Sequence, residues 1–462
     1  MRYTVSEINE LINKNNEIVD VKLTGWIDSK RENELILNIV IRDGSCFNYL
    51  NCICEEKNFK NKDEFNLLKN IEIGSSVLLK GIIKNEFSII SGKIFGKMDK
   101  KIHRNIDFLR DNQHLRMRNK TFQGIGIIRN TLQFEIHNFF NKLGFLNLTS
   151  PILTTTDCEN LGETFNVLKN GNNFFDKRTN LTVSAQLHLE ALVHSFHKVY
   201  NFGPTFRAES GNSEKHLSEF WMIEPEIGFI LFSELMENME IFLKYICAKL
   251  LKRHRDILEY FDVNYENGLL NKLEWVGNVE NKFLRKSYDD CLKFLWNEIE
   301  CGNIIIGREN RRVGNGVLIL EKRPEYGEYF GDEYGLILER YLIEEFGNKP
   351  FFMTNFPKKF KPFYMKSDNS NPDIVQACDL LVPGIGELMG GSMREDNYEK
   401  LKTKIDENGI KDLDWYLELR KNGSIPHGGY GVGFERLMCY VTGMRSVKDV
   451  IPFYRVEGSC FA

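Results

Sequence analysis

The sequence lacks the features that mark secreted, zinc-stabilised and membrane-spanning proteins. Its 10 cysteines include no pair at CxxC spacing, and the closest two, Cys52 and Cys54, lie in a β-like run. This usage argues against a zinc site and is typical of reduced thiols in a cytoplasm. The N-terminal MRYTVSEINE has no basic segment followed by an apolar core, and no apolar run approaches membrane-spanning length. We therefore predict a cytoplasmic protein without a membrane segment.

An excess of charge of one sign is also missing. The formal net charge is -4 over 462 residues, so the chain carries no global basic signal for nucleic acid. A large enzyme can still bind RNA through a local basic patch, so the net charge neither supports nor excludes nucleic-acid binding. The length predicts two or three domains.

The N-terminal part of the chain contains short β-like runs after a short amphipathic helix. Five such runs in close succession are typical of a small barrel, such as the oligonucleotide/oligosaccharide-binding (OB) fold. A barrel of this kind either holds a ligand or is purely structural, and its strands alone do not separate the two. We predict strands at 20–27, 34–42, 49–54, 76–83 and 87–90.

A basic stretch follows the barrel. We predict a barrel domain at 1–98, a hinge at 99–118 and a larger domain at 119–462. Such a run is usually a solvated linker, but beside an RNA-binding barrel it could also touch a phosphate backbone, and both interpretations stay open. The basic residues from 91 to 118, which include the end of the barrel domain, are Lys93, Lys97, Lys100, Lys101, Arg104, Arg110, Arg116 and Arg118.

The larger domain begins with a long predicted helix. Apolar residues recur every three or four positions from Ile128 to Leu143, Gly144 ends the helix, and Ser150-Pro151 follows. Further strands and helices come without regular βα alternation, which favours an antiparallel α+β domain. Residues 252–330 are poorly patterned apart from a helix near 287–299, and we predict that they form an insertion.

Three short stretches carry the chemistry. FRAE places Arg207 and Glu209 two residues apart, so both side chains share one face if the stretch is a strand. IGELMGGSMR contains Glu387 and Arg394 around paired glycines, and GVGFERL places Arg436 after a glycine-rich turn. Each arginine alone would usually be part of a structural ion pair. Together the stretches suit an ATP site, in which arginines hold phosphates and a carboxylate holds Mg²⁺.

In this order, the stretches are similar to the signature motifs of the class II aminoacyl-tRNA synthetases. The long helix with Ser150-Pro151 resembles motif 1, FRAE with the loop after it resembles motif 2, and GVGFERL resembles motif 3. More narrowly, the chain resembles the bacterial-type asparaginyl-tRNA synthetases. The stretches that carry this likeness, from about residue 20 to 455, include LTVSAQL, YNFGPTFRAE, HLSEFWMIEPE, FYMK, GIGELMGGSMRE, HGGYGVGFERL and VTGMRSVKDVIPFYR.

The resemblance implies a fold and a reaction. The fold is a six-stranded antiparallel sheet flanked by helices, preceded by an anticodon-binding OB barrel, in a homodimer with motif 1 and Pro151 at the interface. The reaction has two steps: ATP and asparagine give asparaginyl-adenylate and pyrophosphate, and the 3′ end of tRNA(Asn) then attacks the adenylate. An aspartate–tRNA ligase and a catalytically inactive RNA-binding paralogue are the alternatives.

The resemblance also implies the residues of the ATP site. Arg207 would neutralise the α-phosphate and align the substrate carboxylate, and Arg436 would hold the γ-phosphate against the adenine ring. Glu387 would bind Mg²⁺ together with Asp379. The other implied ATP contacts are Phe220 stacking on adenine, Glu209 accepting from its amino group, and His216 reaching the pyrophosphate unless it is only an exposed loop histidine.

The amino-acid pocket separates neighbouring families. Glu159, Ser184 and Gln186 match positions that hold the substrate ammonium, and Arg394 would donate to the side-chain carbonyl. Where aspartyl-tRNA synthetases carry a lysine, three residues after the matching glutamine, this chain has Leu189.

Those synthetases also place aspartate where Glu224 stands. A carboxylate without the lysine suits a neutral amide and repels a second carboxylate. In the barrel, Asn38 stands where an aromatic side chain usually stacks on the central anticodon base.

Overall fold

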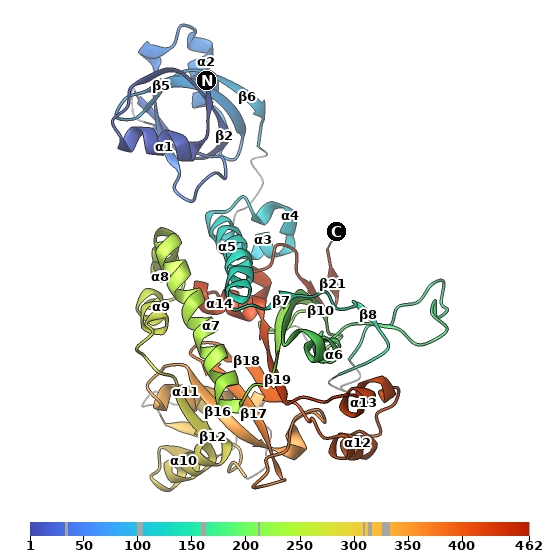
Figure 1. Ribbon diagram of the computed structural model, residues 1–462. Coiled ribbons are helices and arrows are strands. Elements are labelled where there is room, and N and C mark those ends of the chain that lie inside the picture. Colours follow the sequence, from blue (N-terminus) through green and yellow to red (C-terminus); the bar gives the residue numbers. More distant parts are fainter. Residues whose placement is uncertain are drawn as a thin grey trace. The chain divides into compact units, whose positions relative to one another are not determined.

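The computed structural model describes residues 1–32, 36–98, 105–158, 163–210, 213–307, 310–312, 317–325 and 333–461 (Figure 1). By its internal contacts the chain divides into two compact units, residues 1–127 and 128–462. No helix within the described ranges is long and apolar enough to cross a membrane.

The first unit is built on a closed β-ring. Strand β2 (Ile18–Glu32) pairs with both β3 (Ile36–Arg42) and β5 (Ser76–Ile83). Strands β4 (Leu50–Glu55) and β6 (Phe87–Gly96) complete the ring. Buried and partly exposed residues alternate along β5, as expected when one face of each strand lines the interior. The predicted barrel is confirmed.

Short elements surround this ring. Thr4 and Glu7 form a reciprocal capping box that starts α1 (Val5–Asn13), whose Val5 and Ile8 are buried in the barrel core. The remaining elements of the unit are β1 (Arg2–Tyr3), η1 (Glu56–Asn58), α2 (Lys62–Lys69), α3 (Ile106–Asp111) and α4 (Gln113–Arg116). Helix α5 (Lys120–Lys142) begins in the first unit and ends in the second.

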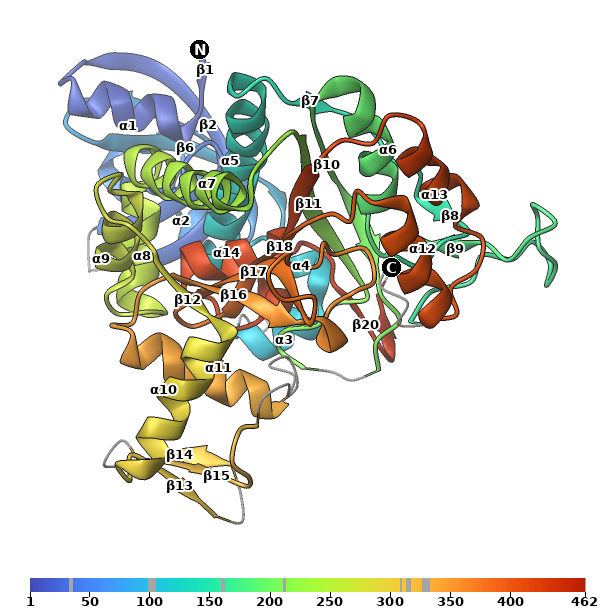
Figure 2. The same cartoon turned by 60° about the horizontal axis from the view of Figure 1, so that its bottom comes forward.

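The second unit contains a sheet of eight strands in the order β12-β16-β17-β18-β19-β11-β10-β7 (Figure 2). The central six are antiparallel to their neighbours, and each edge adds a short parallel strand. The implied six-stranded sheet is therefore present, with an extra strand on each side. The strands are β7 (Leu146–Asn147), β10 (Lys198–Phe206), β11 (Glu219–Gly228), β12 (Leu284–Ser287), β16 (Phe351–Pro357), β17 (Ile374–Val382), β18 (Gly386–Met393) and β19 (His427–Gly433).

Helices pack on this sheet through their apolar faces. Helix α6 (Gln186–Phe196) contacts β10 and β11, α7 (Phe232–Arg253) contacts β18 and β19, and α14 (Phe434–Thr442) contacts β11 and β19. Helix α11 (Glu333–Glu345) contacts β17 and β18. The remaining helices near the C-terminus are α12 (Tyr398–Glu407) and α13 (Asp414–Lys421).

The stretch 252–330 is more regular than its sequence pattern indicates. The helix predicted near 287–299 is α10 (Tyr288–Glu300), started by a capping box at Ser287. Two helices that we did not predict, α8 (Arg255–Asn264) and α9 (Leu269–Gly277), precede it. Besides β12, which joins the large sheet, the stretch contains β13 (Ile304–Ile306), β14 (Arg311–Arg312) and β15 (Leu318–Leu320), which form a small sheet. Each element is short, so few apolar residues per element were available to reveal a period.

Candidate active site

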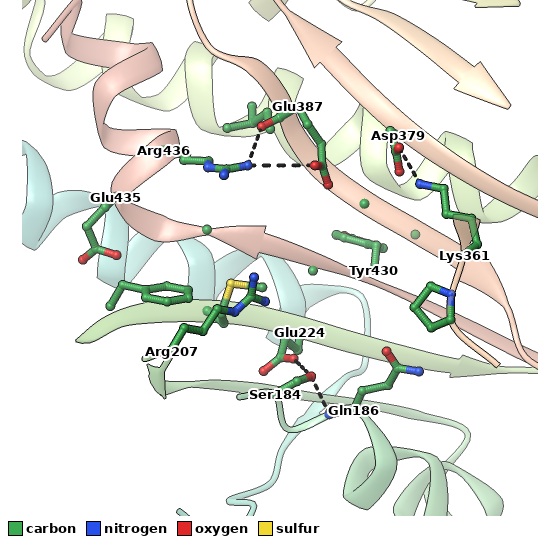
Figure 3. A pocket seen from close by; sticks show the side chains of 18 of the residues that line it. Ser184, Gln186, Arg207, Glu224, Lys361, Asp379, Glu387, Tyr430, Glu435 and Arg436 are labelled. Atoms are coloured by element: carbon green, nitrogen blue, oxygen red, sulfur yellow. Dashed lines mark hydrogen bonds and ion pairs between the residues drawn. The ribbon is translucent and has the colours of Figure 1, made fainter. Parts of the chain in front are cut away.

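A cavity of about 450 Å³ opens in the second unit (Figure 3). Its walls come from the central strands of the sheet, from α6 and α14, and from the loop after β10. Glu159 lies outside the described residues. The other predicted site residues all line this cavity: Ser184, Gln186, Arg207, Glu209, His216, Phe220, Glu224, Asp379, Glu387, Arg394 and Arg436.

Arg207 lies just after the end of β10. The strand ends at Phe206, so the expectation that Arg207 and Glu209 share a strand face is wrong. The two side chains nevertheless stay close, with Nη1 of Arg207 3.8 Å from Oε1 of Glu209. The guanidinium lies over the ring of Phe220, 5.5 Å from its centroid. A cation and an aromatic face are therefore presented together to the cavity.

Lys215 and His216, which precede β11, line the cavity. Nε2 of His216 is 3.6 Å from Oε2 of Glu209, and Nδ1 of His216 is 2.6 Å from the hydroxyl of Ser213. The ammonium of Lys215 donates to the carbonyl oxygen of Ile385 at 2.9 Å. Burial, with Arg340 and Arg436 nearby, lowers the pKa of Lys215 to about 8. The sequence analysis named only His216 of the loop before β11, and Lys215 beside it also lines the cavity.

Arg436 is held by the strand that carries the predicted metal ligand. Its Nη1 donates to the backbone carbonyl of Glu387 at 3.1 Å and lies 3.9 Å from the Oε2 of that residue. The side chain stays 37% exposed, so part of the guanidinium is available to a phosphate. Arg436 therefore faces the cavity from the first turn of α14.

Two carboxylates face each other across a glycine. Asp379 on β17 pairs in register with Gly390 on β18. A Cβ atom at Gly390 would lie 2.7 Å from Oε1 of Glu387 and 3.5 Å from Oδ1 of Asp379. The missing side chain thus leaves a space between two hard oxygen donors, which is the ligand type that Mg²⁺ prefers. Burial raises the pKa of Asp379 to about 6, and Lys361 donates to this carboxylate at 2.7 Å.

A third carboxyl group, Glu339 on α11, was not predicted. It is 5% exposed, and no described group hydrogen-bonds its Oε2. Burial raises its pKa to about 8, and the charges of Glu387 and Asp379 add to this effect. Sequence periodicity gave no reason to separate this residue from the other glutamates of α11.

The N-terminus of α6 forms the opposite wall. The hydroxyl of Ser184 and the backbone N–H of Ala185 both donate to Glu224. The backbone N–H of Gln186 donates to the hydroxyl of Ser184 at 3.1 Å. Leu189, one turn later, is fully buried and lines the cavity. It is the residue that the sequence analysis matched to the lysine of aspartyl-tRNA synthetases.

Arg394 ends this wall and is held by a carboxylate that the sequence analysis missed. Its Nε and Nη2 donate to the two oxygens of Glu226, each at 2.9 Å, and its Nη1 donates to Ser392 at 2.7 Å. A Cβ atom at Gly429 would lie 2.0 Å from Oε2 of Glu226, so only glycine leaves room for this pair. Glu224 and Glu226 are two apart on β11, and this period was a signal that both face the pocket.

Motifs 1 and 3 meet at Glu435, which is buried beside the cavity. It accepts from Nη2 of Arg129 at 2.7 Å and from the backbone N–H of Trp221 at 3.0 Å. The same carboxylate thus joins α5, β11 and α14. The residues on either side of this tie, Phe220 and Arg436, are therefore fixed relative to each other.

The arrangement is suited to joining a nucleotide to an amino acid. One end has two arginines, Arg207 and Arg436, and the two carboxylates that face each other across Gly390. These groups match a nucleoside triphosphate with a divalent cation. The other end is a small pocket with hydrogen-bonding groups and one compensated arginine, which matches a small polar substrate.

Comparisons with known proteins agree with this geometry. A family model described as tRNA synthetases class II (D, K and N) matches residues 105–457. The asparagine–tRNA ligase of Cytophaga hutchinsonii is 37% identical over 98% of both chains. That of Malacoplasma penetrans is 38% identical over 98% of both chains.

Solved structures show the same likeness. The asparaginyl-tRNA synthetase of Pyrococcus horikoshii complexed with asparaginyl-adenylate is similar with a TM-score of 0.81 at 28% identity, over 97% of this chain and 96% of that one. An aspartyl-tRNA synthetase of Entamoeba histolytica, at 20% identity and a TM-score of 0.73, shares the fold. By the match over most of its length and by its relatives, this chain belongs to the class II tRNA synthetases and, within them, to the asparaginyl-tRNA synthetases.

Proposed function

We propose that this chain joins L-asparagine to tRNA(Asn) in two steps. A carboxylate oxygen of asparagine attacks the α-phosphorus of ATP, and the bond from that phosphorus to the bridging oxygen breaks as pyrophosphate leaves. The terminal ribose hydroxyl of tRNA(Asn) then attacks the asparaginyl carbonyl and releases AMP. The observation that carries the amino-acid assignment is the bidentate Arg394–Glu226 pair beside buried Leu189. Because Glu226 offsets its charge, Arg394 can donate hydrogen bonds to the side-chain amide of asparagine but gives little net electrostatic attraction to the side-chain carboxylate of aspartate.

The roles of the nucleotide end follow from the same geometry. Arg207 would stabilise the charge that develops on the α-phosphate, and Phe220 would stack on the adenine, because both border one part of the cavity. Glu209 would accept from the adenine amino group, and His216 and Arg436 would contact the outer phosphates.

The residues present also fit Mg²⁺. Glu387 and Asp379 would hold it across Gly390, where the Cβ of any other residue would intrude. When bound, the ion supplies charge neutralisation to the phosphates.

At the amino-acid end, we assign Ser184, Gln186 and Glu159 to the substrate ammonium. Arg394 would donate to the side-chain carbonyl of asparagine, and Glu224 would bias the pocket against a carboxylate. Glu224 lines the cavity but also holds Ser184 and Ala185, so it acts on the substrate partly through these groups.

Amino-acid-dependent exchange of pyrophosphate into ATP tests this assignment directly. We expect exchange with asparagine and at least about tenfold less efficient exchange with aspartate, since a wrongly charged side chain costs more than 1.4 kcal/mol in a buried site. Equal or better exchange with aspartate would identify an aspartate–tRNA ligase. No exchange with either amino acid from a folded, nucleotide-binding protein would identify an inactive paralogue.

A homodimer in the cytoplasm is part of the proposal. Large apolar side chains on and just after α5 are exposed, among them Phe134 at 62% and Leu146 at 45%, with Ile152 and Leu153 directly after Pro151. A stretch of this kind on a single chain is typical of a surface that a second subunit covers. None of the cysteines in the described residues forms a disulfide bond.

We further assign tRNA binding to the barrel domain, residues 1–98. A groove on its outer face is lined by Lys80, Lys93 and Lys97 together with Phe95, which is 59% exposed. The exposed Lys93 and Lys97 beside this aromatic ring suit the backbone and bases of single-stranded RNA. Lys100, Lys101 and Arg104 of the hinge lie outside the described residues.

Removing two charges from this groove should weaken tRNA binding and leave amino-acid activation intact. For Lys93→Ala/Lys97→Ala we expect the slope of log K against log salt to fall by about 1.4, the loss of two phosphate contacts on a single strand. Pyrophosphate exchange, which needs no tRNA, should be unchanged. The matched control is Lys57→Ala/Lys62→Ala, which removes the same charge from exposed barrel lysines paired with Glu55 and Glu56. Equal salt slopes in the two variants would contradict this assignment of the groove.

A further inference from the structure

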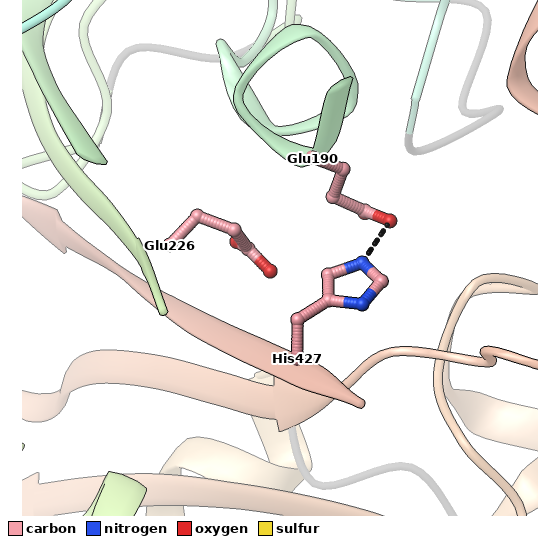
Figure 4. Close-up of side chains that lie close together, drawn as sticks. All are labelled: Glu190, Glu226 and His427. Carbon is pink, nitrogen blue, oxygen red and sulfur yellow. Dashed lines mark hydrogen bonds and ion pairs between the residues drawn. The ribbon is translucent and has the colours of Figure 1, made fainter. Parts of the chain in front are cut away.

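A buried cluster of ionisable side chains borders the amino-acid pocket, and Figure 4 shows three of its members, Glu190, Glu226 and His427. We call it the Glu190 cluster, and it consists of Glu190 on α6, Glu226 on β11, Tyr416 and Arg420 on α13, and His427 on β19. Every member is less than 7% exposed. Burying this much charge is costly, so the cluster needs a reason beyond packing.

Glu190 is the centre of this cluster. Its Oε2 accepts from the hydroxyl of Tyr416 at 2.7 Å and from Nη2 of Arg420 at 2.6 Å, and it lies 3.0 Å from Nε2 of His427. Its Oε1 accepts from Nε2 of Gln186 at 3.0 Å. The carboxylate thus connects helix α13 and strand β19 to the first turn of α6.

The cluster resembles a metal site but is filled by other cations. Single ligand atoms of Glu190, Glu226 and His427 lie within 4.8 Å of one another. Both oxygens of Glu226, however, accept from Arg394, and Oε2 of Glu190 is surrounded by three groups. The guanidinium groups of Arg394 and Arg420 already bind the carboxylate oxygens that would be the ligands of a metal ion.

Arg394 therefore stands between two carboxylates. Glu226 holds it at 2.9 Å, and Oε1 of Glu190 lies 3.9 Å from its Nε. Burial alone would raise the pKa of Glu190, but Arg420, His427 and Arg394 together outweigh burial and lower it. Glu190 is thus ionised, and its negative charge reaches the arginine that faces the substrate.

Gln186 is oriented by the same carboxylate. One N–H of its side-chain amide donates to Glu190, and this bond fixes the amide with its nitrogen toward Glu190, so that its oxygen is free to face the cavity. An acceptor at this place suits the substrate ammonium, whereas a flipped amide would present a donor. Gln186 and Glu190 are four residues apart on α6, which places both on one face of the helix.

We propose that Glu190 is a positioning residue that sets the amino-acid selectivity of the pocket. Anchored by Tyr416, Arg420 and His427, it fixes the acceptor of Gln186 and cancels charge on Arg394. The pocket then accepts a neutral amide and disfavours a carboxylate. This inference rests on the proposed function, because it concerns the choice between asparagine and aspartate.

The test is Glu190→Gln in the full-length chain, which keeps the side-chain shape and removes the charge. We expect the ratio of kcat/KM for asparagine to that for aspartate, measured by pyrophosphate exchange, to fall roughly tenfold to a hundredfold, the factor for one buried charge a few ångströms away. The KM for ATP should stay unchanged. The matched control is Glu240→Gln, which removes another buried glutamate, paired with Lys244 at 2.7 Å on α7.

A purely structural role would lower thermal stability in both variants and leave the ratio at the wild-type value, and that result would overturn the proposal. If Glu190→Gln does not fold, Tyr416→Phe removes one anchor and no charge. We then expect a several-fold rise in the KM for asparagine at unchanged KM for ATP, and unchanged values of both would overturn the proposal. Absence of asparagine exchange by the wild-type protein would instead reject the proposed function.

Discussion

Replacing Arg436 with alanine is expected to reduce asparagine-dependent pyrophosphate exchange by roughly 100-fold to 1,000-fold while the protein stays folded. The leaving pyrophosphate gains negative charge on the outer phosphates, and loss of one preorganised donor to such developing charge costs about 2.7–4 kcal/mol. Arg436 is placed for such a role because its guanidinium is anchored on the carbonyl of Glu387 and still 37% exposed to the cavity. The measurement is the initial rate of exchange at saturating asparagine and ATP.

Arg445 provides the matched control for this prediction. It is an exposed arginine nine positions further along the chain and does not line the cavity. Arg445→Ala should exchange pyrophosphate at the wild-type rate. Arg436→Lys adds a second comparison, because it keeps the charge and loses the planar, two-pronged geometry. Near-normal exchange by folded Arg436→Ala would exclude Arg436 from phosphate binding.

Replacing Gly390 with alanine should have a similarly large effect through the metal. The added methyl group would lie 2.7 Å from Oε1 of Glu387, so this flexible carboxylate must turn away and the two-carboxylate arrangement is lost. Because a bound metal ion stabilises the transition state by several kcal/mol, we expect exchange to fall by about 100-fold or more. The Mg²⁺ concentration for half-maximal activity should rise, and Mn²⁺ titration followed by electron paramagnetic resonance should show weaker binding in the presence of ATP.

The control is Gly126→Ala on α5. No atom lies within 4 Å of a Cβ at that position, apart from its immediate chain neighbours and the backbone of its own helix. Alanine has a higher helix propensity than glycine, so this variant should be at least as stable as wild type and fully active. Wild-type metal dependence in Gly390→Ala would mean that Glu387 and Asp379 do not hold a cation between them.

The barrel and the predicted cavity residues could be found in the sequence because each depends on a local pattern. Alternation marks β5, and glycine-framed motifs mark Glu387 and Arg436. Whether the barrel ends at residue 98, with a hinge to residue 118, stays a prediction. The compact units divide between residues 127 and 128, inside a continuous helix that no sequence pattern interrupts.

The buried partners of the site were harder to find. Glu226 and Glu190 could have been inferred from spacing alone, at two residues from Glu224 on a strand and four from Gln186 on a helix. Their importance lies in Arg394 and Arg420, which approach only after distant segments pack. Glu339 had no comparable signal, because its neighbours Glu387 and Asp379 come from strands far along the chain.

The order of strands in the catalytic sheet has a consequence for synthesis of the protein. Strand β19 (His427–Gly433) is the last of the eight strands in the sequence and therefore the last to be made. In the sheet it lies in the middle, between β18 and β11. Until it emerges from the ribosome, the β10–β11 hairpin and the β16–β17–β18 meander are separate pieces, each with an unpaired edge. A chain that stops before His427 would leave both strand edges unpaired. It would also leave Arg394 without its neighbours on β19. We therefore expect C-terminally truncated products to aggregate rather than persist as partly active enzyme.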